Sequence, residues 1–107
     1  MRIDGPPVLL EPNTAQAIAA TLHELVTNAA KYGALSVADG RVDLKWSHEA
    51  NGLLHLHWAE MGGPPVREPT RKGFGGRIIE QMIVQLKGQT HFDWRAQGLV
   101  CEIELRV

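Results

Sequence analysis

Apolar residues recur along the first third of the chain at three- and four-residue steps, the spacing of one buried helix stripe. The stripe consists of Ile18, Leu22, Leu25 and Ala29. Asn13 or Thr14 can cap this predicted helix, which runs to about Tyr32. Gly33 follows at the point where a residue in the left-handed conformation would end it.

Two further segments alternate between apolar and polar side chains, which predicts strands. They cover residues 41–46 and 53–60, and the turn signal Glu49-Ala50-Asn51-Gly52 between them predicts a hairpin. Further strands are predicted at 2–10, near 90–95 and at 99–107. Because proline cannot donate to a ladder, Pro6 and Pro7 place the first of these at a sheet edge.

A second helix is predicted from about Gly76 to Lys87, with Gly88 at its end. Its apolar positions are Ile78, Ile79, Met82, Ile83 and Leu86. Residues 61–75 are rich in Gly and Pro and are typical of a loop. Strands with one polar face and two helices that need cover indicate an α/β (α+β) two-layer sandwich. We expect a mixed, mostly antiparallel sheet with the helices packed on one face.

The composition is that of an ordinary globular domain, with 44% hydrophobic and 21% charged residues, and 107 residues fit a single domain spanning 1–107. The formal net charge of −1 gives no electrostatic case for nucleic acid. No apolar run approaches the roughly 20 residues that span a bilayer. The single cysteine, Cys101, is consistent with a reducing compartment. We therefore expect a cytoplasmic location without direct membrane contact.

Three polar side chains share one face of the first predicted helix: Glu24, Asn28 and Lys31 are spaced four and then three residues apart. A carboxylate, an amide oxygen and an ammonium on one stripe can hold a hydrated Mg²⁺ and a phosphate, because Mg²⁺ prefers oxygen ligands and keeps several waters. The alternative is a solvated helix face with a Glu–Lys pair.

A carboxylate also stands at the end of the strand 53–60. Glu60 can accept a hydrogen bond from an exocyclic amine such as that of adenine, and the glycines Gly62 and Gly63 allow a flat ring to approach the backbone. A plain strand-to-loop turn is the alternative.

The third segment, Arg71-Lys72-Gly73-Phe74-Gly75-Gly76-Arg77, runs into the second helix. Glycine-rich backbone at a helix N-terminus presents free N–H groups to phosphate, and the basic side chains add charge. The alternative is a loop without a ligand.

The order of these three segments resembles the N, G1 and G2 boxes of the GHKL superfamily of ATPases. More narrowly, the chain resembles the HWE group of sensor histidine kinases, since His23 matches the histidine of the N box and Trp58 with Glu60 matches the W-x-E of the G1 box. The resemblance covers nearly the whole chain and implies a Bergerat-type ATP-binding fold. Two departures are Gly76, where the group often has serine, and the absence of the aromatic-rich box of other histidine kinases, which is also expected of this group. Glu60 stands where most of the superfamily has aspartate.

The resemblance also implies roles for individual residues. Asn28 would hold the Mg²⁺ that bridges the ATP phosphates, Lys31 would contact phosphate, and Glu60 would bind the adenine amine. His23 and Glu24 would lie near the γ-phosphate as catalytic residues together with Asn28, and which of the two assists transfer is open. The other implied nucleotide-binding residues are Tyr32, Gly62, Arg71, Lys72, Gly73, Phe74, Gly75 and Gly76.

The implied activity is transfer of the γ-phosphoryl group of Mg·ATP to a histidine on a separate dimerisation domain of the same kinase. A response regulator downstream and a homodimeric full-length protein are the further expected partners. The remaining histidines, His48, His55, His57 and His91, are expected to be surface or sheet-facing residues, and the pair His55/His57 lacks a third ligand for zinc.

Two other functions remain open from the sequence. One is a vestigial GHKL module that docks a partner or serves phosphotransfer without ATP chemistry. The other is a stand-alone serine kinase of the anti-sigma type. The intact Glu24/Asn28/Lys31 face argues against the first, and the Trp58-Ala59-Glu60 motif against the second.

Overall fold

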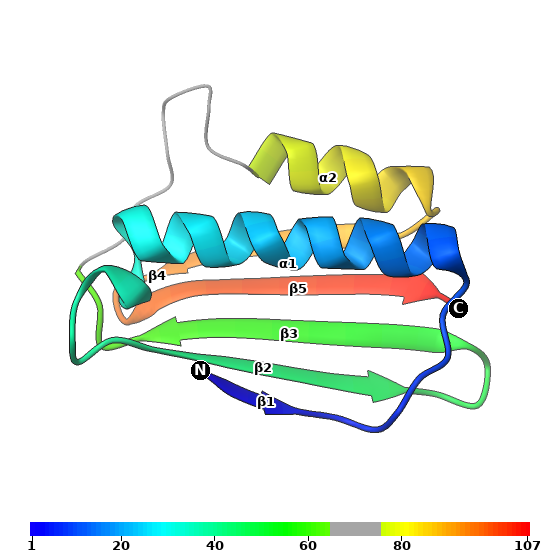
Figure 1. Cartoon of the computed structure of the whole chain (residues 1–107), viewed down its shortest axis with the longest axis horizontal. Coiled ribbons are helices and arrows are strands. Elements are labelled where there is room, and N and C mark those ends of the chain that lie inside the picture. Colours follow the sequence, from blue (N-terminus) through cyan, green and yellow to red (C-terminus); the bar gives the residue numbers. More distant parts are fainter. Residues whose placement is uncertain (65–75) are drawn as a thin grey trace.

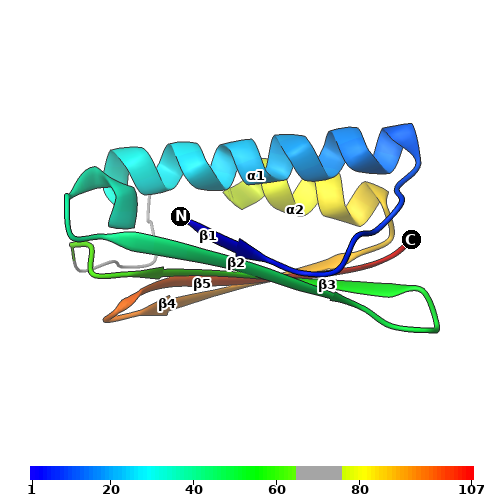
Figure 2. The same ribbon diagram turned by 60° about the horizontal axis from the view of Figure 1, so that its bottom comes forward.

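The protein is a two-layer sandwich in which both helices cover one face of a single sheet (Figures 1 and 2). A computed structural model describes residues 1–64 and 76–107. The elements are β1 (Arg2–Asp4), α1 (Pro12–Tyr32), the 3₁₀ turn η1 (Ala34–Ser36), β2 (Arg41–His48), β3 (Leu53–Met61), α2 (Gly76–Gln85), β4 (Gln89–Arg95) and β5 (Gly98–Arg106). The strand order is β1-β2-β3-β5-β4, with β1 parallel to β2 and the other pairs antiparallel. The predicted fold class is confirmed.

Alternate residues of the central strands form the floor of the core, as the sequence pattern predicts. Leu44 pairs with Trp58, and Trp58 pairs with Cys101, so one row of buried side chains crosses β2, β3 and β5. Leu54 and Leu56 extend the buried face of β3. Each large apolar side chain that is fully buried contributes about 1.5–3 kcal/mol relative to exposure. The opposite face of the sheet carries the polar members of the same alternation.

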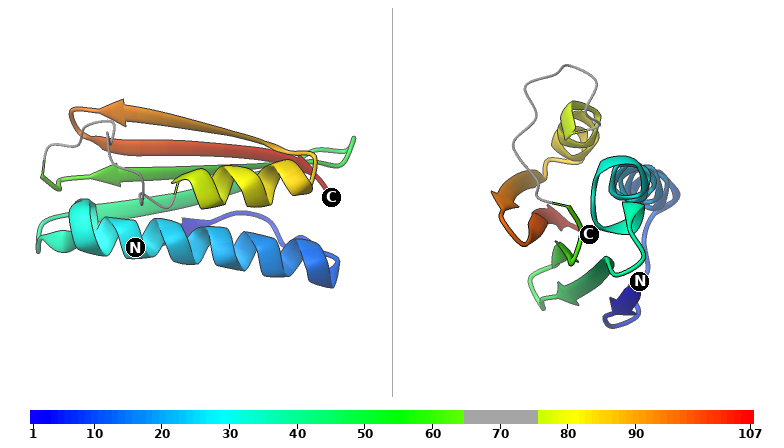
Figure 3. Two further views of the ribbon diagram at one scale, coloured as in Figure 1. Left: turned by 90° about the horizontal axis from the view of Figure 1, so that it is seen from above. Right: turned by 90° about the vertical axis from the view of Figure 1, so that its left-hand side faces the viewer.

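The helices run side by side over the sheet (Figure 3). The helix α1 buries Ile18, Leu25 and Ala29, while Leu22 is only partly buried. Thr21 is buried as well, which the apolar pattern does not predict, and its hydroxyl donates to the Ala17 carbonyl at 2.8 Å. That internal hydrogen bond allows a polar side chain to lie in the core. The helix α2 buries Ile79 and Ile83.

The predicted start of α1 is wrong by two or three residues. The N-cap position is Glu11, without a side-chain cap, and Pro12 opens the helix. Pro12 is favourable there because the first turn has no use for its missing N–H. The predicted left-handed Gly33 is also wrong, since its φ is −115°. Its N–H still ends the helix by donating to Ala29 O at 3.1 Å.

At the end of α2 the left-handed residue is Lys87, with a φ of 60°, rather than Gly88. The helix itself ends at Gln85, and the Gly88 N–H donates to Ile83 O at 2.9 Å. The strand predicted at 2–10 is shorter than expected, because β1 ends at Asp4. The Trp46 indole N–H donates to Pro6 O at 2.6 Å, so the proline segment is fixed by a side chain instead of a ladder.

Candidate functional site

Glu60 is a buried carboxylate near the end of β3. It is 5% exposed and lies on the helix side of the sheet, on the same face as Leu54, Leu56 and Trp58. Its Oε1 accepts a hydrogen bond from the Ala34 backbone N–H at 3.0 Å, and its Oε2 accepts one from the Trp58 indole N–H at 3.0 Å. Such bonds to an ionised acceptor are about twice as strong as bonds between neutral groups. They stabilise a buried acid that would otherwise be costly.

Two glycines make room for Glu60. A Cβ at Gly33 would overlap Oε1 of Glu60, and a Cβ at Gly98 would overlap the Glu60 carbonyl oxygen. Gly98 also has a φ of +147°, which residues other than glycine rarely adopt. The sequence predicts Gly33 only as the end of a helix and predicts no role for Gly98. The sequence near Gly33 and Gly98 does not reveal these contacts, because Glu60 is distant in the sequence and the fold brings it next to both glycines.

Asn28 lies on the C-terminal half of α1, close to the Glu60 end of the molecule. Its side chain is partly buried, and its Nδ2 is buried without a hydrogen-bond partner in residues 1–64 and 76–107. A buried amide N–H without a partner costs about 1–3 kcal/mol, so an acceptor from a ligand is favourable at this position. The other end of the amide is an oxygen of the type that Mg²⁺ takes. The residues present therefore fit a Mg²⁺-bound anion.

The structure brings Asn28 and Glu60 to the same end of the protein. Gly33 follows α1 directly, and the place of its missing Cβ lies 3.2 Å from Ala29 Cα as well as against Glu60. Ala29 is the neighbour of Asn28 in α1. The carboxylate of β3 thus lies at the end of the helix that carries the amide. Most of the glycine-rich segment of the predicted convergence lies outside the described residues, so the convergence of all three stays a prediction.

The other predicted residues of α1 differ in their placement. Glu24 is partly buried and lies one turn before Asn28, on the same side of the helix. Lys31 and Tyr32 are exposed, Tyr32 by 70%. His23 is exposed and, five residues from Asn28, lies about 140° around the helix from it. Of the two candidates for assisting transfer, Glu24 therefore shares the side of Asn28 and His23 does not.

The structure describes only part of the predicted glycine-rich segment. Arg71, Lys72, Gly73, Phe74 and Gly75 lie outside the described residues. Gly76 is the first residue of α2, whose N-terminal end lies beside the middle of α1 (Figures 1 and 3). Gly62 has a φ of 74°, and a Cβ there would lie 2.7 Å from Asp39 O, so its backbone requires glycine without any ligand. Its predicted contact with nucleotide stays a prediction.

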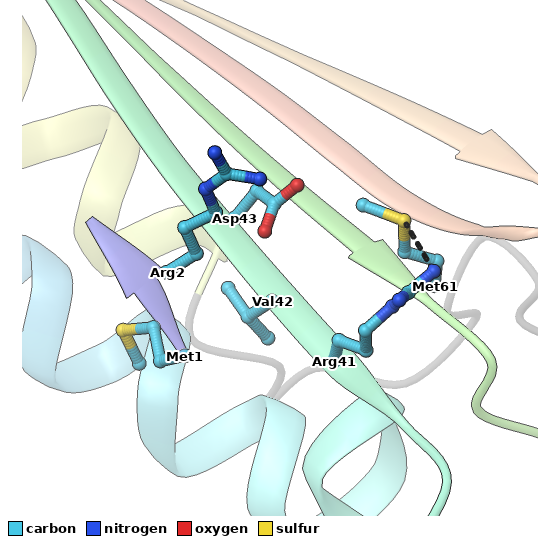
Figure 4. A pocket seen from close by; sticks show the side chains of 6 residues that line it. All are labelled: Met1, Arg2, Arg41, Val42, Asp43 and Met61. Carbon is cyan, nitrogen blue, oxygen red and sulfur yellow. Dashed lines mark hydrogen bonds between the residues drawn. The ribbon is translucent and has the colours of Figure 1, made fainter. Parts of the chain in front are cut away.

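A hollow of about 410 Å³ lies elsewhere, over β1, β2 and the end of β3 (Figure 4). Its lining residues are Met1, Arg2, Arg41, Val42, Asp43 and Met61. Arg2 and Asp43 are register partners, and the Arg41 guanidinium contacts the Met61 sulfur at 4.0 Å. None of the predicted site residues takes part, so this hollow is not the predicted site.

The histidines of β3 lie on the outer face of the sheet, as the sequence predicts. His57 Nδ1 lies 3.1 Å from Glu102 Oε1, and His55 Nε2 lies 3.9 Å from the same oxygen. Within the two described stretches, no three His, Cys, Asp or Glu side chains form a group that could hold a metal ion. Cys101, by contrast, lies on the buried face, where burial raises the pKa of its thiol to about 12, assisted by the negative charges of Glu102, Glu60 and Glu80.

Comparison with known proteins identifies the relatives of this chain, although no family model matches it. The blue-light-activated histidine kinase 1 of Erythrobacter litoralis is 47% identical over 107 residues. A blue-light-activated histidine kinase of Rhizobium johnstonii is 36% identical over 104 residues. The chain belongs to the histidine kinase family. The alignments include 96% and 95% of this chain but only 29% and 30% of those two proteins. This chain therefore spans under a third of their length.

Solved structures of histidine kinases share the fold of this chain. The histidine kinase domain of the Erythrobacter litoralis EL346 blue-light-activated kinase superposes with a TM-score of 0.83, over 98% of this chain and 50% of that one, at 22% identity. The catalytic domain of the histidine kinase ThkA gives a TM-score of 0.66 over 85% of this chain and 65% of that one, at 20% identity. The HWE motif residues are consistent with this relationship. No helix in the described ranges is long and apolar enough to cross a membrane, and the cytoplasmic location stays a prediction.

Proposed function

We propose that residues 1–107 are the ATP-binding catalytic domain of a protein histidine kinase. The domain binds Mg·ATP and transfers the γ-phosphoryl group to a histidine on a separate dimerisation domain of the same kinase. One observation supports this most directly. The buried acceptor Glu60 lies at the end of the helix that carries Asn28, whose buried Nδ2 has no partner within residues 1–64 and 76–107.

The adenine end of the proposed site is Glu60. An ionised carboxylate only accepts hydrogen bonds, and its two oxygens offer about four lone-pair positions. Two are occupied by the N–H groups of Ala34 and Trp58, which leaves acceptor capacity for the exocyclic amine of adenine. The glycine-bearing backbone at Gly62 adjoins this position in the chain.

The phosphate end is the C-terminal half of α1. Asn28 would hold Mg²⁺ through its amide oxygen, and its Nδ2 would donate to a phosphate oxygen. Lys31 is exposed one turn away from Asn28 and can reach phosphate with its flexible ammonium. The metal would neutralise charge on the phosphates, and the residues Arg71 to Gly76 would contribute further positive charge and N–H donors.

In the transfer itself, a neutral imidazole nitrogen attacks the γ-phosphorus. A P–N bond forms, the P–O bond to the leaving ADP breaks, and the second ring nitrogen can release its proton. The imidazole nitrogen is already nucleophilic, so the work of the domain is to position the phosphoryl group and neutralise its charge. Onward transfer to a response regulator, and a homodimeric full-length kinase, complete the proposal.

The test has two stages. Mg·ATP is first titrated into the 107-residue chain with and without a chelator, and binding that requires Mg²⁺ is expected. The chain is then mixed with labelled ATP and a histidine-bearing dimerisation domain, and an acid-labile, base-stable phosphorylated product is expected. Absence of nucleotide binding would instead favour a docking module without ATP chemistry. An acid-stable product on a serine-bearing acceptor would favour a serine kinase.

A further inference from the structure

Both oxygens of the Glu60 carboxylate are held by donors of the chain itself. Ala34 supplies a backbone N–H to Oε1, and Trp58 supplies its indole N–H to Oε2, each at 3.0 Å. Neither donor can rotate away. The Ala34 N–H belongs to the backbone where α1 passes into η1, and the Trp58 ring is 1% exposed. The direction of the remaining acceptor positions is therefore fixed before any ligand arrives.

We infer that Trp58 and Gly33 are specificity-determining positioning residues, which orient Glu60 to accept only from a purine ring that carries an amine at position 6. This inference rests on the proposed function, in which Glu60 contacts the base. An amine at position 6 of a purine donates to a carboxylate, whereas a 6-oxo group presents a second acceptor and is repelled. Neither Trp58 nor Gly33 needs to touch the nucleotide for this effect.

The two donors also explain why an acid is required at position 60. Two N–H groups that face two oxygens are both satisfied only by a carboxylate. A glutamine at position 60 would turn its NH₂ group toward one of these two N–H groups, so that two hydrogen-bond donors would face each other without an acceptor between them. The arrangement thus keeps residue 60 a pure acceptor, because the chain itself supplies the donors that an amide would repel.

Gly33 acts by what it lacks. The position of its missing Cβ overlaps Oε1 of Glu60 and lies 3.2 Å from Ala29 Cα. The φ of Gly33 is −115°, which any residue can adopt. Glycine is therefore needed there for the close approach of the carboxylate and not for the backbone conformation. An alanine at position 33 would move the Glu60 carboxylate away from the Ala34 N–H.

Trp58 can be tested with a matched control in the adjacent strand. Trp58→Phe removes the donor to Glu60 and keeps an aromatic ring in the core. Trp46→Phe removes another indole N–H, the one that donates to Pro6 O at 2.6 Å, and leaves Glu60 untouched. Each variant of the 107-residue chain is titrated with Mg·ATP and with Mg·purine riboside triphosphate, which lacks the 6-amine. Urea unfolding shows that each variant is folded under the binding conditions.

The native chain is expected to prefer ATP by about tenfold, the size of one hydrogen bond to a charged acceptor. Trp58→Phe should reduce this ratio by at least about threefold, while Trp46→Phe leaves it unchanged. If the native chain prefers ATP and Trp58→Phe retains the full preference, or if both variants lose it equally, the inference is wrong and the proposed function stands. If the native chain binds both nucleotides equally, the base-binding role of Glu60 fails, and the inference fails with it.

A double-mutant cycle tests Gly33 separately and covers the case in which Trp58→Phe does not fold. Gly33→Ala is measured alone and in combination with Glu60→Asp, whose carboxylate is one methylene shorter. If the added methyl acts by displacing the carboxylate, Gly33→Ala should reduce the preference for ATP at least about threefold in the native background and less in the Glu60→Asp background. Equal losses in both backgrounds would contradict the steric role of Gly33.

Discussion

Ala34 donates its backbone N–H to Oε1 of Glu60 at 3.0 Å, a hydrogen bond that joins the end of α1 to the end of β3. The bond connects two segments that are separated by 26 positions in the sequence. Asn28 lies less than two turns before Ala34, so the same contact sets the spacing between the amide and the carboxylate. The two ends of the proposed nucleotide site are therefore held in one rigid relation by the fold.

Asn28→Ala should abolish Mg²⁺-dependent ATP binding and transfer without unfolding the domain. The Nδ2 of Asn28 has no partner in the described part of the protein, so its removal leaves no donor or acceptor of that part unsatisfied. Because a buried Nδ2 without a partner is unfavourable, the free energy of unfolding should not fall and can rise by up to about 3 kcal/mol. Isothermal titration with Mg·ATP and urea unfolding measure the two quantities.

Asn13→Ala is the matched control for that experiment. Asn13 lies in the first turn of the same helix and is exposed, far along α1 from Asn28. Its removal should leave nucleotide binding unchanged. Full retention of Mg·ATP binding by Asn28→Ala would count against the proposed site, as would an equal loss in both variants.

Glu60→Ala should remove the preference between bases. Without the carboxylate, the amine of ATP loses its acceptor and the oxo group of GTP is no longer repelled, so the two nucleotides should bind with similar affinity. Competition between ATP and GTP for the chain measures the ratio directly. An unchanged preference for ATP would refute the role of Glu60 in base recognition.

Glu60→Gln should destabilise the fold even without nucleotide. One of the two N–H donors, from Ala34 or Trp58, would face the NH₂ group of the glutamine, and a buried donor without an acceptor costs about 1–3 kcal/mol. Urea denaturation of the free chain gives the difference. Glu102→Gln is a suitable comparison, because its carboxylate is 42% exposed and its contact with His57 should contribute below about 1 kcal/mol.

The strand pattern could be predicted from the sequence because it depends on local alternation. The rows of Val42 and Leu44 in β2, and of Leu54 to Glu60 in β3, follow directly from the two-residue period of a strand. The convergence of Asn28 with Glu60 on one nucleotide rests on the resemblance to a family with three boxes in a fixed order, and it stays a prediction. Two expectations from that resemblance are confirmed: the fold class and the relationship to histidine kinases.

The contacts that hold Glu60 were not predictable in the same way. Gly33 and Gly98 are glycines because of atoms that lie far from them in the sequence. Thr21 is buried because its hydroxyl can bond to the preceding turn of its own helix, which no apolar pattern records. The predicted helix ends differ from the structure for a related reason. Pro12 begins α1 without a capping side chain before it, and Lys87 adopts the left-handed conformation that is usual for glycine at a helix end.

Cys101 should be inert toward thiol reagents in the folded protein. The reactive form is the thiolate, and a pKa raised to about 12 by burial and by neighbouring acids leaves almost none of it at pH 8. Modification by iodoacetamide should therefore proceed only through unfolding, and its rate should rise with urea in step with the unfolded fraction. Fast modification of the native chain at pH 8 would contradict the buried placement of Cys101.

The same thiol makes stability depend on pH above 9. Its ordinary pKa is 9.0, so between about 9 and 12 the unfolded chain releases a proton that the folded chain retains. Fewer bound protons in the unfolded state mean that the free energy of unfolding falls as pH rises through this window, while the full contribution is present below pH 9. Cys101→Ala should show a flatter decline over the same range than the native chain.

The two neighbouring isoleucines Ile78 and Ile79 should differ sharply in their contribution to stability. Ile79 is fully buried in α2, facing α1 and the sheet, whereas Ile78 is 51% exposed. Ile79→Ala removes buried methyl groups and leaves a cavity, which costs about 2–5 kcal/mol. Ile78→Ala changes an exposed side chain and should cost under about 1 kcal/mol, with alanine favoured in a helix. Urea unfolding of both variants therefore tests which side of α2 meets the core, since equal costs would mean that the helix is rotated from its described position.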